Sequence, residues 1–300
     1  IRNALKGKFL QENSIRALVQ NIEACDEVWV VSRGAGDNLR SIGYTGEYII
    51  MENGVDMPYG RVAQEKSDEA AKGFDLPEGV PVFLFVGRLQ WYKGLRIILD
   101  ALKMLQEKKI DFRMVFIGSG GDEKEVRAYA EKLDVPCFFT GSIMDRELLR
   151  AWYCRADLFL FPSTFDTNGL VVREAAACSV PSVLIRQSSA AEGIVDGENG
   201  FLIEENALSM AQKLTSICEE KELLQKTGEQ AGKTLYLSWE DAVAKAYARY
   251  EIVIDQYRSG KYPKRDKLLD GFFRVQGELM EAFGRVDTFY EKVRATFLQR

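Results

Sequence analysis

The sequence predicts an α/β protein built around a Rossmann-like, doubly wound parallel sheet. Between residues 82 and 185, short apolar runs alternate with helical patterns of about three turns. The apolar runs lack polar alternation, which is typical of strands covered on both faces. The chain has 300 residues, of which 46% are hydrophobic, enough for about two domains with a sizeable core.

The N-terminal part predicts one β-α-β step. Residues 14–24 carry apolar side chains at helical spacing, 27–32 indicate a buried strand, a short helix follows, and 47–51 indicate another strand. The segment 53–66 is polar and rich in turn residues, so we place the domain boundary there and treat residues 1–52 as a separate part.

The regular part follows this boundary. It predicts strands that alternate with helices, namely strands 82–87, 112–118, 137–141, 157–161 and 181–185, and helices 94–108, 122–133, 145–155 and 169–178. Ligands of such sheets bind at the carboxyl ends of the strands, so candidate residues follow Val86, Ile117, Thr140 and Phe161.

The C-terminal part predicts two helices. Ser238 and Asp241 resemble a capping box that starts a helix ending near residue 259, which separates a domain at 53–237 from a return helix at 238–259. A helical extension within 260–300 begins near residue 266 and repeats apolar residues every three or four positions. This stripe favours packing on the same protein; a dimer seam and a membrane-surface helix stay open.

Composition excludes several classes of function. With 40 Lys and Arg against 45 Asp and Glu, the net charge of −5 offers no field for a nucleic acid. The absence of histidine excludes Ser-His-Asp triads and histidine-ligated zinc. Five scattered cysteines predict buried, reduced thiols, and no apolar run has the length of a membrane span or signal peptide, so we expect a cytoplasmic location.

A glycine cluster follows the second strand of the regular part. Gly118-Ser119-Gly120-Gly121 suggests dinucleotide binding, but Glu123 stands where the third glycine of that motif belongs. No acidic residue ends the next strand to hold an adenosine ribose. A tight turn before a helix is therefore the favoured interpretation, with an NAD site as the weaker alternative.

Two cations follow the first strand of the regular part. Gly87 is followed by Arg88, and Lys93 comes five residues later, at the sheet edge where a ligand would lie. A guanidinium fork and a mobile ammonium suit a diphosphate. Taken alone, the pair fits two solvated surface cations beside a helix start better than a ligand site, because such charges are usually solvated.

The most informative segment covers residues 161–185. A loop with Asp166 and Asn168 precedes a helix that opens at Gly169-Leu170 and carries Glu174 in its second turn. Free amides at the helix start form a second anion site. Carboxylates beside a diphosphate are unfavourable unless they bind sugar hydroxyls, so this site indicates a nucleotide joined to a sugar; for Glu174 an ordinary helix-start carboxylate stays open.

These motifs, in this order, resemble the donor-binding half of the family 4 retaining glycosyltransferases of the GT-B fold. The resemblance rests on G-R-L-x-x-x-K-G at 87–94, the acidic-x7-Glu segment containing N-G-L, Glu192 with D-G-E-N-G-F-L at 196–202, N-G-V-D at 53–56 and S-W-E at 238–240. It covers about residues 15–258.

The resemblance implies a hexosyltransferase-type enzyme (EC 2.4) that transfers a sugar, with retention and without a metal, from a nucleotide diphosphate sugar, most often a UDP-sugar. Arg88 and Lys93 would hold the diphosphate and Glu174 the ribose. Asp166 occupies the place of the first glutamate of the family, which contacts the transferred sugar. The remaining donor-site positions are Gly87, the base-binding Gly141, Ser142 and Ile143, and Asn168, Gly169 and Leu170 beside the phosphates. Glu192 would shape the floor of the cleft.

Neither a metal nor a separate cofactor is expected, because the chain has no D-x-D pair and the nucleotide-sugar is the donor substrate. The resemblance implies a glycan or lipid acceptor, which leaves open a peripheral site at the inner face of a membrane. Self-association through residues 266–300 is a further expectation.

One departure from the family concerns the N-terminal domain, which builds the acceptor site. Residues 1–52 resemble only its last elements. The alternative to an enzyme is therefore a non-catalytic nucleotide-sugar-binding subunit, or a half-enzyme that needs a separate N-terminal domain. A nicotinamide dehydrogenase is a third, weaker reading.

Overall fold

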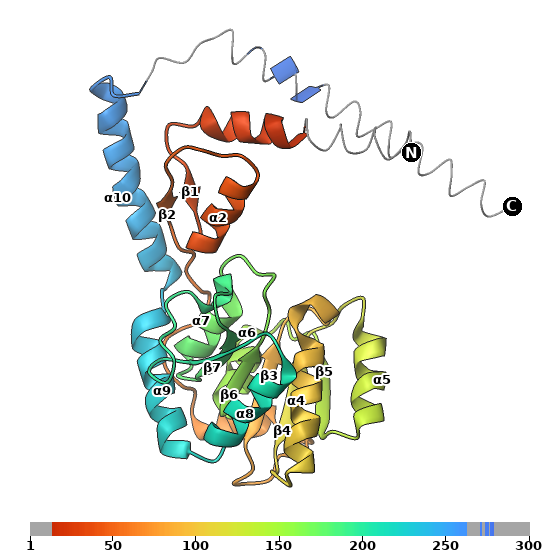
Figure 1. Cartoon of the computed structure of the whole chain (residues 1–300). Helices are drawn as coiled ribbons and strands as arrows, with labels where there is room; N and C mark the ends of the chain where they lie inside the picture. Colours follow the sequence, from red (N-terminus) through yellow and green to blue (C-terminus); the bar gives the residue numbers. More distant parts are fainter. Residues whose placement is uncertain (1–13, 263–270, 272–273, 276, 279–300) are drawn as a thin grey trace, which may run out of the picture. The chain divides into compact units, whose positions relative to one another are not determined.

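The computed structural model describes residues 14–262, 271, 274–275 and 277–278 (Figure 1). Contacts divide this part of the chain into two compact units. The larger contains residues 30–37 and 50–246; the other contains 14–29, 38–49 and the described residues from 247 onward. Residues 30–37 thus belong to the larger unit, whereas the sequence analysis treats residues 1–52 as a separate part. The domain boundaries given above stay a prediction.

The centre of the larger unit is a parallel sheet of six strands, five of which the sequence predicts. In spatial order β5-β4-β3-β6-β7-β8, these strands are β5 (Cys137–Gly141), β4 (Arg113–Ile117), β3 (Val82–Val86), β6 (Leu158–Phe161), β7 (Ser182–Ile185) and β8 (Phe201–Ile203). The chain fills one half of the sheet and then returns to fill the other, which confirms double winding. β8 was not predicted.

Helices cover both faces of this sheet (Figure 1). Those on one face are α4 (Leu95–Glu107), α5 (Glu123–Leu133) and α8 (Ala207–Ile217); those on the other are α3 (Gln64–Ala70), α6 (Arg146–Arg155), α7 (Leu170–Ala177) and α9 (Lys221–Leu235). The sequence predicts α4 to α7 within one or two residues at each end. It did not predict α3, α8 or α9, nor the short 3-10 helices η1 (Trp91–Lys93) and η2 (Ser189–Ala191).

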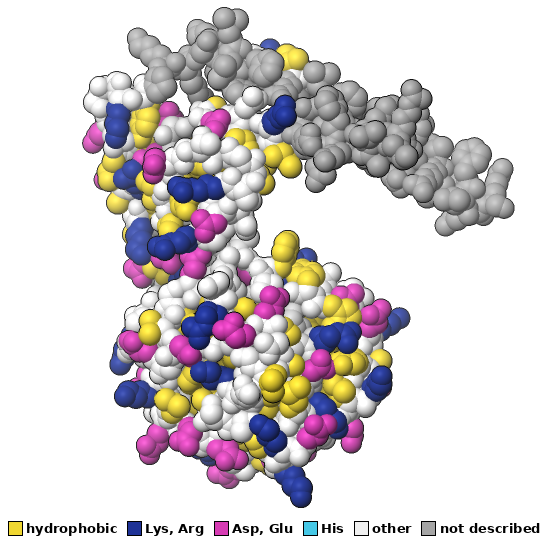
Figure 2. Space-filling view, viewed as in Figure 1, with side chains coloured by type: hydrophobic (Ala, Val, Ile, Leu, Met, Phe, Trp, Pro, Cys, Tyr) yellow, Lys and Arg dark blue, Asp and Glu magenta, His cyan; other side chains and the backbone are white. Residues whose placement is uncertain are grey.

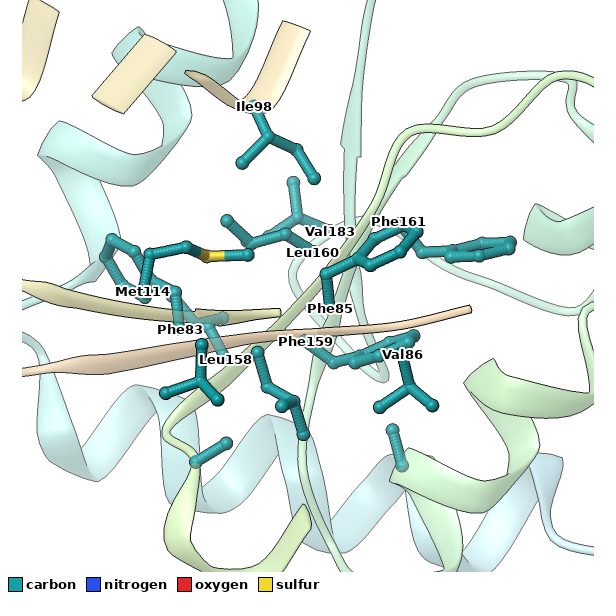
Figure 3. Packing of buried hydrophobic residues seen from close by; sticks show 14 of the residues in the cluster. Phe83, Phe85, Val86, Ile98, Met114, Leu158, Phe159, Leu160, Phe161 and Val183 are labelled. Atoms are coloured by element: carbon teal, nitrogen blue, oxygen red, sulfur yellow. The ribbon is translucent and has the colours of Figure 1, made fainter. Parts of the chain in front are cut away.

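Aromatic side chains join the two central strands. Phe85 of β3 lies 5.9 Å from Phe161 of β6, measured between ring centroids, and Phe161 stacks in turn on Phe159. Figure 3 shows these rings packed with Leu160 and Val183 in one continuous cluster. Because the strands are buried on both faces, the start of each loop at their carboxyl ends is fixed by the core.

The N-terminal strands are short. β1 (Trp29–Val30) and β2 (Ile49–Ile50) form a two-stranded sheet, joined by α2 (Arg33–Ser41), and residues 14–23 are helical. This agrees with the predicted β-α-β step.

The return helix α10 (Trp239–Arg258) begins as predicted. Ser238 Oγ accepts a hydrogen bond from the Asp241 backbone N–H at 3.0 Å and donates one to the Asp241 carboxylate at 2.7 Å. The extension predicted from residue 266 lies almost entirely outside the described residues; the five described positions within it are helical.

The five cysteines are free thiols, and their burial differs from expectation at one position. Cys154, Cys178 and Cys218 are buried and Cys137 is half-buried, but Cys25 is exposed. Cys25 follows the last turn of the helix at 14–23, where solvent reaches it. The prediction of uniformly buried thiols was therefore wrong for Cys25.

The surface carries charges of both signs. On the face of the larger unit in Figure 2, Lys and Arg side chains alternate with Asp and Glu, and no single sign dominates. Within the part of the chain that the structure describes, no helix has the length and apolar character needed to cross a bilayer.

The loops that follow β3 and β6 touch where the winding of the sheet reverses. Gly94 ends η1 with a left-handed φ of +76°, and a Cβ atom there would lie 2.0 Å from the carbonyl oxygen of Pro162. Only glycine permits this approach. The contact sets the spacing of two loops that the sequence predicts to carry ligand-binding residues.

We expect Gly94→Ala to lower the free energy of unfolding by about 3 kcal/mol, because it adds a clash to the cost of a left-handed alanine. Gly79→Ala is the matched control, since Gly79 has a similar φ of +83° but no atom within 4 Å of its Cβ position. It should lose only about 1–2 kcal/mol. Urea unfolding measures both; equal losses would show that the contact with Pro162 does not constrain the loops.

Candidate functional site

An ion pair joins the loops that follow β3 and β6. Lys93 Nζ lies 2.8 Å from Asp166 Oδ2 and also donates a hydrogen bond to the Phe165 carbonyl at 3.1 Å. β3 and β6 are the neighbours at which the winding reverses, and their carboxyl ends open onto the crevice where such sheets bind ligands. The structure therefore brings together two residues that are 73 positions apart.

Lys93 is held on several sides. It is only 8% exposed, and its ammonium lies 5.5 Å from the ring centroids of both Tyr92 and Phe161. Such cation–π contacts stabilise a partly desolvated ammonium. Lys93 is thus a largely buried, paired cation, and not the mobile surface charge that the sequence suggested.

The turn that carries Lys93 is fixed by Trp91. The Trp91 backbone N–H donates to the Asp122 carboxylate at 2.9 Å, and its indole Nε1 donates to Glu125 at 3.1 Å. The guanidinium of Arg96 lies 4.7 Å from the centroid of the Trp91 ring. These contacts anchor η1 to α5 and limit where the Lys93 side chain can begin.

Asp166 uses its other carboxylate oxygen at the start of α7. Oδ1 accepts hydrogen bonds from the backbone N–H of Gly169 at 2.8 Å and of Asn168 at 3.3 Å. Burial raises the pKa of the Asp166 carboxyl, but the hydrogen bonds from Lys93 and Gly169 outweigh burial, so the pKa lies below the ordinary value of 3.8.

The beginning of α7 has unused donors. No described group accepts a hydrogen bond from the backbone N–H of Leu170 or Val171. The backbone N–H of Gly169, which the resemblance assigns to the phosphates, donates to Asp166 instead. The Asn168 side chain is 6% exposed and its Nδ2 has no partner among the described residues. Buried amides are normally paired, so an unpaired donor at this position is unusual.

Glu174 forms a second charged cluster on α7. Its Oε2 accepts from the buried Tyr153 hydroxyl at 2.9 Å, and its Oε1 accepts from Arg146 at 2.9 Å. Burial, with the nearby Glu174 charge, raises the pKa of Tyr153 well above its ordinary value, so the phenol stays a proton donor. Glu174 lies five residues after Gly169, about 7.5 Å along the helix axis.

The structure does not bring Arg88 into either cluster. Arg88 is exposed in the loop after Gly87, and no hydrogen bond or ion pair joins its guanidinium to a described residue. Its backbone is nevertheless fixed, because a Cβ atom at Gly118 would lie 2.0 Å from the Gly87 carbonyl oxygen. The glycine cluster at 118–121 therefore forms a close turn, which is the interpretation that the sequence favours.

The predicted base-binding segment lies at the carboxyl end of β5. Gly141 has a φ of +76°, Ser142 is exposed with its Oγ 2.9 Å from Ser119 Oγ, and Ile143 packs on the core. Glu192 has a different setting, because its carboxylate accepts from the backbone N–H groups of Arg33 at 2.8 Å and Gly34 at 2.6 Å. Glu192 therefore caps α2.

Arg146 and Tyr153, the partners of Glu174, were not predicted from the sequence. Arg146 and Tyr153 lie on α6, and nothing in their local pattern marks them; their signal is the helical spacing of seven that puts both on one face of α6.

Within the described part of the chain, no three acidic or cysteine side chains gather in a way that could hold a metal ion.

A protein-family model matches more than half of the chain. The model of the family described as glycosyl transferases group 1 matches residues 66–234, which include both charged clusters.

Curated relatives match over part of their length. A D-inositol 3-phosphate glycosyltransferase of Arthrobacter sp. (strain FB24) is 26% identical over 211 residues, which cover 68% of this chain and 50% of the relative. The sulfoquinovosyl transferase SQD2 of Arabidopsis thaliana is 31% identical over 172 residues, covering 55% and 32%. The chain thus spans half or less of the length of these two relatives.

Solved structures share the fold. A sucrose-phosphate synthase of Thermosynechococcus elongatus superposes with a TM-score of 0.71 at 21% identity, over 81% of this chain and 62% of that protein. HepE of Anabaena, solved with UDP and glucose, superposes with a TM-score of 0.70 at 20% identity, over 80% and 67%.

We expect Tyr153→Phe to lower the free energy of unfolding by about 1.5–3 kcal/mol, because the buried Glu174 carboxylate loses a hydrogen bond. Tyr129→Phe is the matched control: the Tyr129 hydroxyl also donates to a carboxylate, that of Asp100 at 2.6 Å, but it is only half-buried. Denaturant unfolding of both variants measures the difference. A larger loss in the control would mean that burial does not strengthen the Glu174 contact.

A second expectation concerns pH. The native pKa of Asp166 lies below its ordinary value of 3.8, so its contribution to stability is fully present above that value and lost as pH falls through the native pKa. The difference in unfolding free energy between wild type and Asp166→Asn should be constant from about pH 7 to 5 and shrink below about pH 4. A constant difference down to acid unfolding would contradict the ion pair.

Proposed function

The chain belongs to the glycosyl transferases group 1 family, and from this premise we propose that it is the donor-binding part of a glycosyltransferase that takes a sugar from a nucleotide diphosphate sugar. The observation that carries the proposal is the position of Lys93 and the first turn of α7. Both lie at the carboxyl ends of the two strands where the sheet reverses its winding, and both present donors to an anion.

A diphosphate fits these donors. The Lys93 ammonium supplies charge, and the free N–H groups of Leu170 and Val171 point out of the helix start, where the helix dipole favours an anion. Arg88, exposed and unpaired within the described residues, adds a guanidinium from the loop after β3. We propose that these groups hold the diphosphate.

The same groups account for the chemistry. Breaking the bond between the sugar and the diphosphate leaves negative charge on the departing phosphate, and catalysis requires donors already in place where this charge develops. We propose that Lys93, Arg88 and the α7 amides stabilise it without a metal ion, and that the sugar is transferred with retention.

Glu174 is the proposed ligand of the ribose. A carboxylate has about four acceptor positions, and Tyr153 and Arg146 use two of them. The remaining positions suit hydroxyl donors, and the paired Arg146 offsets the charge of Glu174 beside a diphosphate. Gly141, Ser142 and Ile143 are the proposed contacts of the base.

UDP-sugars are the proposed donors. HepE of Anabaena, which shares the fold, is described in complex with UDP-glucose. TarM of S. aureus is described with UDP and α-GlcNAc-glycerol.

A glycan or lipid acceptor is proposed for the whole protein. A cytoplasmic location, contact with a membrane surface and self-association through residues 266–300 likewise stay proposals.

A non-catalytic nucleotide-sugar-binding subunit is a second candidate, because the donors of Lys93 and of the start of α7 would bind a nucleotide-sugar whether or not transfer follows. A sugar-transfer assay with UDP-glucose, with and without an added N-terminal domain from a relative, separates the two. Transfer in either condition supports the enzyme; binding without transfer in both supports the subunit.

We expect Lys93→Ala and Arg88→Ala each to weaken UDP binding about ten- to a hundredfold, since each removes one charged donor to phosphate. Isothermal titration calorimetry measures the affinity. Lys72→Ala is the matched control, because the Lys72 side chain is 75% exposed and, among the described residues, pairs with Glu69 alone; it should bind UDP like the wild type. Unchanged affinity in both site variants would refute the proposed diphosphate site.

A further inference from the structure

We propose that Asp166 is a positioning residue: it acts through Lys93, by holding the ammonium toward the diphosphate, and not by contacting the transferred sugar. This inference rests on the proposed function. It departs from the role that the family resemblance implies, and it assigns the aspartate a task that its short side chain fits.

The geometry leaves the Asp166 carboxylate little freedom. One oxygen lies 2.8 Å from Lys93 Nζ and the other 2.8 Å from the Gly169 N–H, so both are engaged by this chain. The carboxylate is 19% exposed and lies between the two loops it joins. To reach a sugar hydroxyl it would have to give up a charge-assisted hydrogen bond.

Lys93 has one donor to spare. An ammonium carries three N–H groups; one meets Asp166 and one the Phe165 carbonyl. No described residue accepts from the third, so Asp166 and a nucleotide can share the ammonium without competing for the same hydrogen. Two fixed bonds determine the direction of the third.

Without this tether a lysine side chain is among the most mobile in proteins. Its ordering costs about 0.5–1.5 kcal/mol when a ligand must supply it, which corresponds to a loss of up to about tenfold in affinity. The ion pair with Asp166 already orders the Lys93 side chain in the free protein, so the ligand need not supply this free energy. The aromatic rings of Tyr92 and Phe161 limit the remaining directions of the ammonium.

The test compares UDP with UDP-glucose in wild type and Asp166→Asn. Asparagine keeps an oxygen that can accept from Gly169 but replaces the oxygen facing Lys93 by an NH₂ group, which cannot accept from the ammonium. We expect calorimetry to show that UDP and UDP-glucose both bind about tenfold more weakly to the variant. A sugar contact would instead weaken UDP-glucose alone.

A double-mutant cycle tests whether the effect passes through Lys93. In a Lys93→Ala background, we expect Asp166→Asn to change UDP affinity by less than about twofold. A purely structural role would lower thermal stability without this dependence on Lys93. Asp75→Asn is the matched control, since Asp75 pairs with Arg113 at the opposite end of the sheet, with a side chain 74% exposed; its UDP affinity should equal that of the wild type.

The outcomes separate the two proposals. If wild type binds UDP and Asp166→Asn binds it equally or more tightly, or if the loss persists in the Lys93→Ala background, the positioning role is overturned and the donor site stands. If wild type binds neither UDP nor UDP-glucose, the proposed function fails and this inference fails with it.

Discussion

The ion pair between Lys93 and Asp166 is the interaction on which the proposed site depends. It joins the loops after β3 and β6, the two strands that lie side by side only because the chain returns across the sheet to begin its second half. The close approach of Gly94 to Pro162 sets the distance between these loops. The packed aromatic rings beneath them keep the strand ends in place. The site is therefore a product of the order of the strands, with the core as its support.

Charge compensation explains how two carboxylates can lie near a proposed diphosphate site. Asp166 is paired with Lys93, and Glu174 with Arg146, which also lies 3.7 Å from the Asp56 carboxylate, so each of the two site carboxylates has a cation beside it. An anion entering this region meets nearly neutral pairs together with the free amides of α7. Arg88 is the cation of the predicted set that no described carboxylate neutralises.

The sequence predicted the central part of the fold well and its outer part incompletely. β3 to β7 are strongly apolar and are bounded by turn residues, so their positions follow from local pattern. β8 has only three residues, too short for a pattern to mark. The site residues Lys93, Asp166 and Glu174 could be selected from their places after strands. Their partners could not, because the pairing of Lys93 with Asp166, and of Glu174 with Tyr153 and Arg146, depends on which strands and helices become neighbours.

The anchoring of Trp91 gives the molecule a built-in optical reporter. Trp91 is one of four tryptophans in the chain and sits two residues before Lys93, with its indole bonded to Glu125 and covered by Arg96. Emission from an indole responds to its surroundings, so an occupant that shifts η1, which carries both Trp91 and Lys93, would alter the environment of this ring. Changes in intrinsic fluorescence would then report events at the crevice without any attached dye.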